Sequence, residues 1–394
     1  MMLHKATVKN VSRAFKEVKS FDEEGSFEFV VRDALKNVLE DGMELERTEY
    51  LEVEDYQRSK ERFDFRNGYY ERDLLTQFGN IRLSVPRVRK GNFSTKLLAA
   101  YQRRTKSLDE AIKSAYFLGV SSRKVENAFM PLVGEGISAA TVSRLTKSLD
   151  EQVKEFHNRR LSDNYSYLFL DGIVLKERGA VKTVKKVILC AYGVKPDGKR
   201  ELIDFMPASS ESQVHWEAFL NDLFKRGLLG KNLKLVITDG GKGLHAALDA
   251  VYPRVPRQRC WFHKLSNVVN YLKKKDIDGC IAEARRIYNA SNYREAVSRY
   301  WEWAKKWRNI APKAVECLER DLDDLLTFFT CEPKHRKMIR TTNAIERIFK
   351  EVKRRTKPIG VFNNVKSLER IVFAVITHLN HKWKNKPLTN FTHN

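Results

Sequence analysis

Three acidic residues occur within or directly after strongly apolar segments of this sequence. Asp171 interrupts the segment YLFLDGIVL, Asp239 ends the segment KLVITD, and Glu346 lies on the helical pattern NAIERIFKEV. A carboxylate removed from water is strongly unfavourable unless it is paired or bound to a metal. Three such side chains from separate elements can hold two Mg²⁺ ions about 3.5–4 Å apart, the arrangement that activates a water or hydroxyl in phosphoryl transfer. Oxygen ligands favour Mg²⁺ or Mn²⁺ over zinc, so we expect two ions of this kind in one active site.

Each acidic residue also has an interpretation that needs no chemistry. Asp171 and Gly172 could be the two-residue turn of a β-hairpin, because Asp-Gly readily adopts the positive φ angles of such turns. Asp239 could cap the helix that follows it, and Glu346 with Asn343 could form a capping box at a helix N-terminus. Spacing alone does not choose between these alternatives, because a chain with 50 acidic residues contains many triples of them.

A second candidate group combines cysteine and histidine. Cys260 and His263 could form a Cys₂His₂ zinc site with Cys331 and His335, but the long separation favours a packed structural motif for Cys260 and His263. The 5 cysteines include no Cys-x-x-Cys pair, which is typical of reduced thiols in a cytosol. The N-terminal residues lack the apolar core of a secretory signal, so the expected location is cytoplasmic.

The charge balance indicates the partner. The chain has 73 Lys and Arg against 50 Asp and Glu, a net charge of +23 at pH 7, which attracts a polyanion such as nucleic acid. No apolar run approaches the ~20 residues of a membrane-spanning helix, so no membrane partner is expected. The candidate DNA-binding residues are Arg87, Arg89, Lys90, Thr141, Ser143, Arg144, Lys147, Arg340, Arg347, Lys350, Lys353, Arg354 and Arg355. Their alternative role is an ordinary solvated face.

The apolar periodicity predicts the elements that position these residues. Residues 1–60 form a helical segment for dimerisation or DNA binding, residues 61–106 a small β-rich basic module, and residues 107–160 two helices joined by a Gly-containing link. That link, with Ser138 as N-cap of the second helix, favours a helix-turn-helix for double-stranded DNA over an ordinary helical hairpin. Over residues 161–260 the order three strands, helix, strand, helix, strand predicts a mixed α/β sheet covered on both faces.

Several segments together resemble a known protein family. They are RNGYYERDLLTQFGNIRLSVPRVRKGNF, YLFLDGIVLKE, LVITDGGKGLHAAL, RCWFHKLSNVV and TTNAIERIFKEVKRRTKPIGVF. These are similar to the DDE transposases of bacterial insertion sequences in the mutator-like, MuDR-related group, and the resemblance runs from about Arg66 to His381. It implies that Asp171, Asp239 and Glu346 are the catalytic and metal-binding triad of a ribonuclease H-like core.

The resemblance also implies the remaining organisation and the function. The Cys-x-x-His spacing is a signature of that family, residues 261–335 become an all-α insertion, and residues 336–394 complete the core with the Glu helix and a C-terminal helix. Such a protein binds the terminal inverted repeats of its element, cleaves the 3′ ends by two-metal hydrolysis and joins them to target DNA, as a homodimer on the bacterial nucleoid. Two alternatives stay open: a catalytically silent DNA-binding regulator derived from a transposase, and a nuclease selective for DNA structure.

Overall fold

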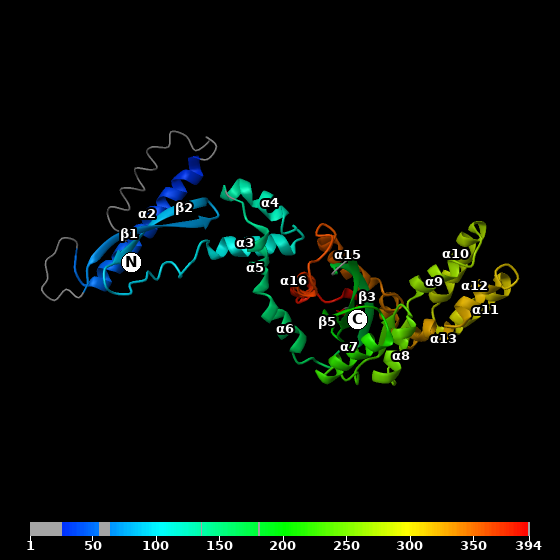
Figure 1. Ribbon diagram of the computed structural model, residues 1–394. Helices are drawn as coiled ribbons and strands as arrows, with labels where there is room; N and C mark the ends of the chain where they lie inside the picture. The colour runs from blue at the N-terminus through cyan, green and yellow to red at the C-terminus, as the bar shows by residue number, and fades with distance from the viewer. Residues whose placement is uncertain (1–25, 55–63, 135, 180–181, 393–394) are drawn as a thin grey trace. The chain divides into compact units, whose positions relative to one another are not determined.

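The computed structural model describes residues 26–54, 64–134, 136–179 and 182–392 (Figure 1). These residues belong to two compact units, of which the first ends at Lys147 and the second begins at Ser148. Of the predicted N-terminal segment 1–60, residues 1–25 and 55–60 lie outside the described part of the chain.

The described part of the first unit contains a long helix, a β-hairpin and shorter helices. Their bounds are α2 (Ser26–Leu51), β1 (Arg66–Thr76), β2 (Gly79–Val88), α3 (Lys106–Phe117), α4 (Lys124–Val133) and α5 (Ala139–Lys147). Ile81, Leu83 and Val85 alternate along β2 and are buried with Met43 of α2. One face of the hairpin therefore rests on α2, as the strict alternation of apolar residues predicts.

Two turn signals of the first unit have different outcomes. The hairpin turns between Thr76 and Gly79, and Gly79 has a φ of 111°, which a glycine adopts without strain. Asn67 and Gly68 are also a pair that favours a turn, but both residues lie within β1, where the pairing with β2 shifts register.

The Gly-containing link lies between α4 and α5. Gly134 ends α4 with a left-handed backbone at a φ of 68°. Ser138 Oγ accepts a hydrogen bond from the backbone N–H of Thr141 at 3.2 Å, so the prediction that Ser138 caps the second helix is confirmed.

The second unit contains a sheet, helices on both of its faces and a helical insertion. Its elements are α6 (Asp150–Asn158), β3 (Tyr167–Arg178), β4 (Thr183–Val194), β5 (Arg200–Ala208), α7 (Gln213–Lys225), β6 (Leu235–Thr238), α8 (Lys242–Val251), β7 (Arg257–Arg259), α9 (Trp261–Val269), η1 (Lys274–Asp276), α10 (Ile277–Tyr288), α11 (Tyr293–Trp307), α12 (Pro312–Glu319), α13 (Leu322–Leu326), η2 (Thr327–Thr330), α14 (Pro333–Ile339), α15 (Asn343–Thr356), α16 (Val365–Trp383) and α17 (Thr389–Thr392).

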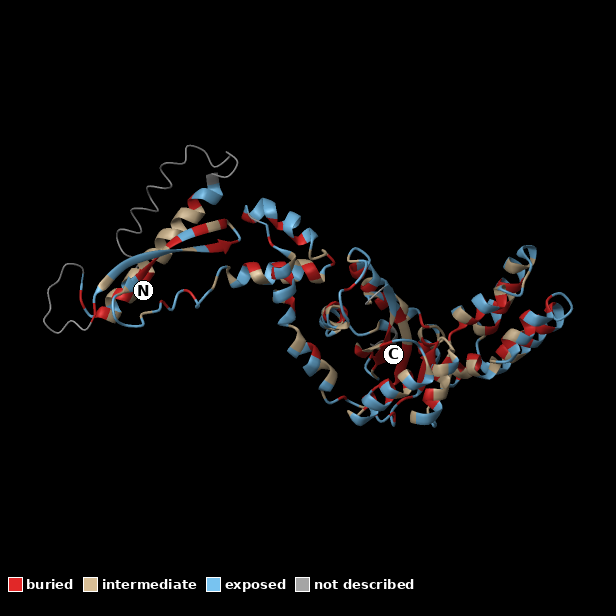
Figure 2. Ribbon diagram, in the orientation of Figure 1, coloured by how far each residue is buried: buried red, intermediate tan, exposed pale blue. Residues whose placement is uncertain are grey.

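The sheet has the strand order β5-β4-β3-β6-β7, with β3 in the centre. β4 is antiparallel to β3 and β5, whereas β6 runs parallel to β3 and to β7. This arrangement confirms the predicted mixed sheet in an α/β unit. Figure 2 shows the buried residues concentrated in these strands.

The two faces of β3 have different neighbours. Leu168 and Leu170 are buried in a core that includes Trp216 of α7 and Leu244 of α8. Side chains alternate along a strand, so Asp171 points to the opposite face, against which α15 packs. β3 therefore places Asp171 on the face that packs against α15, the helix that carries Glu346.

Between β7 and α15 the chain is almost entirely helical. The indole N–H of Trp303 on α11 donates to the Cys280 carbonyl of α10 at 3.1 Å, and that of Trp307 donates to the Glu283 carboxylate at 2.8 Å. These bonds fix α11 against α10, with buried residues between the helices and exposed residues outside (Figure 2). Among the described residues, no helix is long and apolar enough to cross a membrane.

Candidate active site

Asp171 lies on an uninterrupted strand. Asp171 pairs with Cys190 of β4 and Gly172 pairs with Leu189, and the pairing continues on both sides of them. The chain does not turn at this position, so the β-hairpin alternative is wrong. A polar residue in the middle of a buried strand then needs a partner or a role.

Asp239 directly follows the end of β6 and lies close to Asp171 of the central strand β3. β3 and β6 are parallel, and their pairing ends with Phe169 opposite Ile237. Asp171 and Asp239 each lie two residues beyond this pair, and the charge of Asp239 acts on Asp171. Asp239 Oδ1 accepts the backbone N–H of Gly241 at 2.9 Å, and Gly241 rather than Asp239 is the N-cap residue of α8. The helix-cap alternative for Asp239 is therefore wrong.

The pKa of Asp171 is raised by burial and by the nearby charge of Asp239. Burial raises it most, and the negative charge of Asp239 raises it further, to about 7. A hydrogen bond from the backbone N–H of Gly172, at 2.7 Å, only partly opposes these effects. The two carboxylates thus lie close together in surroundings that favour a proton or another cation.

Glu346 enters from α15. This helix begins at Asn343 and has Thr342 at the N-cap position, so the predicted capping box of Asn343 and Glu346 is wrong by one residue. Instead, Thr342 Oγ1 donates to Glu346 Oε1 at 2.9 Å. The apolar residues of the helical pattern NAIERIFKEV, which include Ile345 and Val352, are buried, and they hold α15 against β3.

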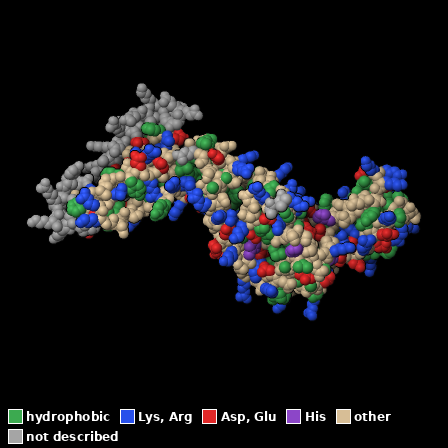
Figure 3. All heavy atoms as spheres, viewed as in Figure 1, with side chains coloured by type: hydrophobic (Ala, Val, Ile, Leu, Met, Phe, Trp, Pro, Cys, Tyr) green, Lys and Arg blue, Asp and Glu red, His purple; other side chains and the backbone are tan. Residues whose placement is uncertain are grey.

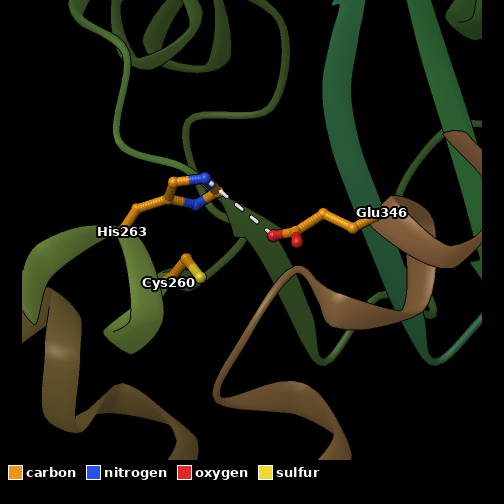
Figure 4. A group of neighbouring side chains, drawn as sticks. All are labelled: Cys260, His263 and Glu346. Carbon is orange, nitrogen blue, oxygen red and sulfur yellow. Dashed lines mark ion pairs between the residues drawn. The ribbon is translucent and has the colours of Figure 1, made fainter. Parts of the chain in front are cut away.

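Cys260 and His263 lie at the same place. Thr342 Oγ1 is 3.3 Å from Cys260 Sγ and 3.3 Å from His263 Nδ1, although its single proton serves one acceptor at a time. His263 Nε2 is 3.9 Å from Glu346 Oε1, and the two side chains point toward each other (Figure 4). Sequence analysis assigned only a structural role to this pair, whereas the structure brings it to the carboxylates.

His263 interacts electrostatically with Cys260 and with the carboxylates of Glu346 and Asp171. Its hydrogen bond with Cys260 raises the pKa of His263 to about 9, and the charges of Glu346 and Asp171 contribute to the increase. Burial disfavours the Cys260 thiolate, but hydrogen bonds with His263 and Thr342 outweigh it and lower the pKa of Cys260. A protonated His263 therefore lies near Asp171 and Glu346 at neutral pH.

Two sets of side chains fit metals of different kinds. Asp171, Asp239 and Glu346 offer only oxygen ligands, which suit Mg²⁺ or Mn²⁺. Cys260, His263 and Glu346 have ligand atoms within 4.8 Å of one another, but a metal ion there would have to displace the proton of His263, whose pKa is raised to about 9. The three carboxylates are therefore the better candidate metal ligands at neutral pH.

The Cys₂His₂ alternative requires four residues in one place. His335 Nδ1 is instead 2.8 Å from the hydroxyl of Tyr167, and Cys331 neighbours the same tyrosine. In the described part of the chain, neither residue joins the group of Cys260 and His263. The structure contradicts that alternative.

Sequence analysis missed a fourth carboxylate, Glu211. It follows β5, which runs in the same direction as β3 because both are antiparallel to β4. A side-chain carbon at Gly172 would lie 2.5 Å from Glu211 Oε1, so the glycine leaves room for this carboxylate. Partial loss of water, and then the charge of Asp239, raise the pKa of Glu211. Glu211 lies three residues after the end of β5, and an acid close to the end of a strand is the signal that could have identified it.

The cations near Glu346 differ in their availability. Arg354 and Arg355 form ion pairs with Glu351 at 2.8 and 2.6 Å, and Arg355 is buried. Arg340 donates to the Tyr288 carbonyl at 3.0 Å. The cations of α15 that are exposed and form no ion pair with another described residue are Arg347, Lys350 and Lys353.

A basic cavity of about 840 Å³ lies along α15 and α16. The cations that line it are Arg200, Lys337, Arg347, Lys350, Arg354, Arg355 and Lys382. Figure 3 shows Lys and Arg side chains spread over the visible face of the second unit. A cavity with this lining attracts phosphates.

The candidate residues of the first unit are mostly exposed. Arg87 lies at the end of β2, and Arg89 and Lys90 follow it, all three on the surface. On α5, Ser143, Arg144 and Lys147 are exposed. Thr141 is only 8% exposed, so its side chain does not share the surface of the other α5 candidates, contrary to expectation.

Comparison with known proteins defines the class of this protein. A sequence model described as "Transposase, Mutator family" matches residues 6–386. The chain therefore belongs to the Mutator family of transposases, and the resemblance noted in the sequence is confirmed.

Individual relatives have names consistent with this family. The transposase for insertion sequence element ISRM5 of Rhizobium meliloti is 34% identical over 375 residues, which cover 95% of this chain and 92% of the relative. The transposase for insertion sequence element IS256 in transposon Tn4001 of Staphylococcus aureus is 36% identical, with 93% and 94% covered. The transposase for insertion sequence element IS1081 of Mycobacterium tuberculosis is 33% identical, with 83% and 79% covered.

Proposed function

We propose that the chain is a DDE transposase with Asp171, Asp239 and Glu346 as its catalytic carboxylates. It binds the terminal inverted repeats of its own insertion sequence, cleaves the 3′ ends by hydrolysis and joins the freed 3′ hydroxyl to target DNA. The observation that supports the proposal is the parallel pairing of β3 and β6, because Asp171 and Asp239 each follow its last pair by two residues, and α15, which carries Glu346, packs against β3. The strand order β5-β4-β3-β6-β7 with helices on both faces supports a ribonuclease H-like core.

The three carboxylates have the chemistry to hold divalent cations. Two Mg²⁺ or Mn²⁺ ions supply activation of a water or hydroxyl and stabilisation of the leaving oxygen of a phosphodiester. Asp171, Asp239 and Glu346 would hold them. The repulsion that helps to raise the pKa of Asp171 to about 7 is the cost that a bound cation removes.

Neighbouring residues position these carboxylates. Thr342 donates to Glu346 at 2.9 Å and the imidazolium of His263 lies 3.9 Å from it, so both favour one orientation of the Glu346 side chain. Gly172 leaves space for Glu211 beside Asp171. Glu211 adds a further negative charge close to Asp239.

Basic surfaces bind the DNA. In the second unit, Arg347, Lys350 and Lys353 are free to contact phosphates next to Glu346. In the first unit, the exposed residues of α5 include Arg144 and Lys147, which suit recognition of the terminal repeat. Two copies of the chain, each holding one end of the element on the nucleoid, would form the active homodimer.

The test is an assay with a labelled duplex that carries the inverted repeat flanking the gene. With Mg²⁺ or Mn²⁺ we expect cleavage at the 3′ end and joined products, and with a chelator binding without cleavage. Specific binding without cleavage under every condition would instead identify a silent regulator. Equal cleavage of unrelated duplexes would identify a structure-selective nuclease.

A further inference from the structure

A cavity of about 320 Å³ lies between the start of the insertion and the junction of α14 and α15. Its lining combines aromatic rings with positive charge. The rings belong to Trp261, Phe262 and Tyr288, and the cations are Arg285, Lys337 and Arg340. Aromatic faces stack on nucleobases and cations neutralise phosphates, so this lining has the chemistry that recognises a nucleotide.

Part of the wall is held firmly in place. The buried indole of Trp261 donates its N–H to the Leu325 carbonyl at 2.7 Å, and its ring centroid lies 5.1 Å from that of Tyr288. The guanidinium carbon of Arg340 is 4.5 Å from the centre of the Tyr288 ring. These contacts organise the wall before any ligand arrives.

Phe262 differs from Trp261 because its side chain is exposed to water. Its side chain is 55% exposed, although it directly precedes His263 of the catalytic site. An aromatic ring on the edge of a basic cavity offers a stacking face to an incoming base. Phe262 is therefore the residue that would stack on the ligand.

The cavity is continuous with the basic cavity along α15. Lys337, Thr341 and Asn343 line both. Thr341 and Asn343 flank Thr342, whose hydroxyl donates to Glu346 at 2.9 Å. A DNA strand in the basic cavity can therefore continue into the aromatic cavity, past the segment whose Thr342 contacts Glu346.

The volume of the cavity limits the size of the ligand that it can hold. A volume of about 320 Å³ is at the lower end of the roughly 300–1,000 Å³ of small-molecule sites, so it admits one nucleotide and not a duplex. We propose that this cavity binds a single nucleotide that leaves the base stack of the DNA held at the carboxylate site. The proposal rests on the proposed function, because the DNA must be bound there first.

The free energy needed to extrude a base is comparable to the free energy that the cavity can return by binding it. Extruding a base from a duplex is unfavourable by a few kcal/mol and is easiest for a mismatched or unpaired base. Stacking on an aromatic side chain and neutralisation of a phosphate offset that cost. A duplex with an unpaired base should therefore bind more tightly than its fully paired equivalent.

The experiment uses the full chain with Asp171→Asn, which keeps bound DNA uncut. Two short duplexes of one sequence serve as probes, one fully paired and one with a single bulged 2-aminopurine, whose fluorescence falls when it stacks. We expect tighter binding of the bulged duplex and quenched fluorescence. Adding Phe262→Ala should abolish the quenching and reduce the preference by roughly 5- to 100-fold, the contribution of one stacked base.

Two matched variants complete the test. Phe262→Trp keeps a stacking face and should retain the preference, and Trp301→Ala removes an exposed ring of α11 outside the cavity and should change nothing. Equal affinity for the two duplexes, or quenching that survives Phe262→Ala, would overturn the pocket alone. Failure to bind either duplex would overturn the proposed function with it.

Discussion

The candidate DNA-binding residues of the first unit and the carboxylate site of the second unit differ in how far their charged side chains are exposed to water. In the first, Arg87, Arg144 and Lys147 lie on the surface. In the second, Asp171 and His263 lie among partners that shift their pKa values to about 7 and about 9. Charges in water attract DNA over a distance, whereas charges removed from water interact strongly and can take part in chemistry.

Under the proposed function, this difference predicts that DNA binding and catalysis depend on different residues. Substitutions on the exposed surfaces should alter affinity for DNA and its dependence on salt. Substitutions in the carboxylate site should alter cleavage and leave affinity nearly unchanged. A variant that changes both would show that the two functions share residues.

The largest effect is expected in the carboxylate site. Asp171→Asn, Asp239→Asn and Glu346→Gln each remove one charge and keep nearly the same shape, so each should reduce cleavage and joining by more than about a thousandfold. Double variants should lose little more, because the residues act as a unit. The measurement is cleavage of the terminal-repeat duplex with binding followed in parallel.

Glu346→Gln is the most informative of the three. Glutamine can also accept the hydrogen bond from Thr342, which is 2.9 Å long in the native chain, so helix α15 should stay folded. Strong cleavage by this folded variant would remove Glu346 from the site and direct attention to Glu211.

The next largest effect concerns the first unit. Arg144→Ala should weaken binding to the proper repeat by about 1–3 kcal/mol if Arg144 contacts a base, whereas a phosphate contact would weaken all DNA alike. Arg82→Ala is the control, because Arg82 is exposed but already pairs with Asp73 at 3.2 Å. Unchanged affinity of Arg144→Ala for every duplex would leave α3 to α5 as ordinary packed helices.

A smaller effect is expected for Glu211. Its charge lies close to Asp239, so Glu211→Gln should weaken Mn²⁺ binding by about tenfold, which corresponds to about 1.4 kcal/mol. The measurement is calorimetric titration of the full chain with Mn²⁺ alone. Glu217→Gln on α7, outside the site, is the control, and equal affinity in both variants would exclude Glu211 from the metal site.

Stability should depend on pH through Asp171. A carboxyl pKa raised to about 7 in the folded chain, against about 3.9 when unfolded, means that the folded state holds the proton more tightly. The contribution of Asp171 to the free energy of unfolding is therefore greatest below about pH 4, falls as pH rises toward 7 and is then constant. In metal-free protein the unfolding temperature should fall by a few degrees over this range. Asp171→Asn should lack this slope, and saturating Mn²⁺ should reduce it.

The sequence predicts well those features that depend on local patterns. The apolar run around Asp171, the strand that ends at Asp239 and the buried stripe with Ile345 and Val352 each arise from alternation or helical periodicity. The structure confirms these elements. Parallel pairing of two such strands also accounts for the proximity of Asp171 and Asp239.

The remaining features depend on contacts between distant segments. Thr342 meets Cys260 only because α15 packs beside the start of α9, and Glu211 approaches Asp171 only because Gly172 has no side chain. No periodicity encodes these distances. The helix start at Asn343 differs by one residue from the predicted capping box, and this shift frees Glu346 from a purely local role.

The smallest effect is expected for Cys260→Ser. Serine can still accept the backbone N–H of Thr342, which is 3.3 Å from the sulfur, so the free energy of unfolding should fall by only about 1 kcal/mol. Serine does not ionise, however, and His263 then loses the main cause of its pKa of about 9. We expect that pKa to move toward the ordinary value of about 6.5, as measured by NMR titration of the imidazole. An unchanged pKa, or one tightly bound zinc per native chain by elemental analysis, would contradict a hydrogen bond between Cys260 and His263.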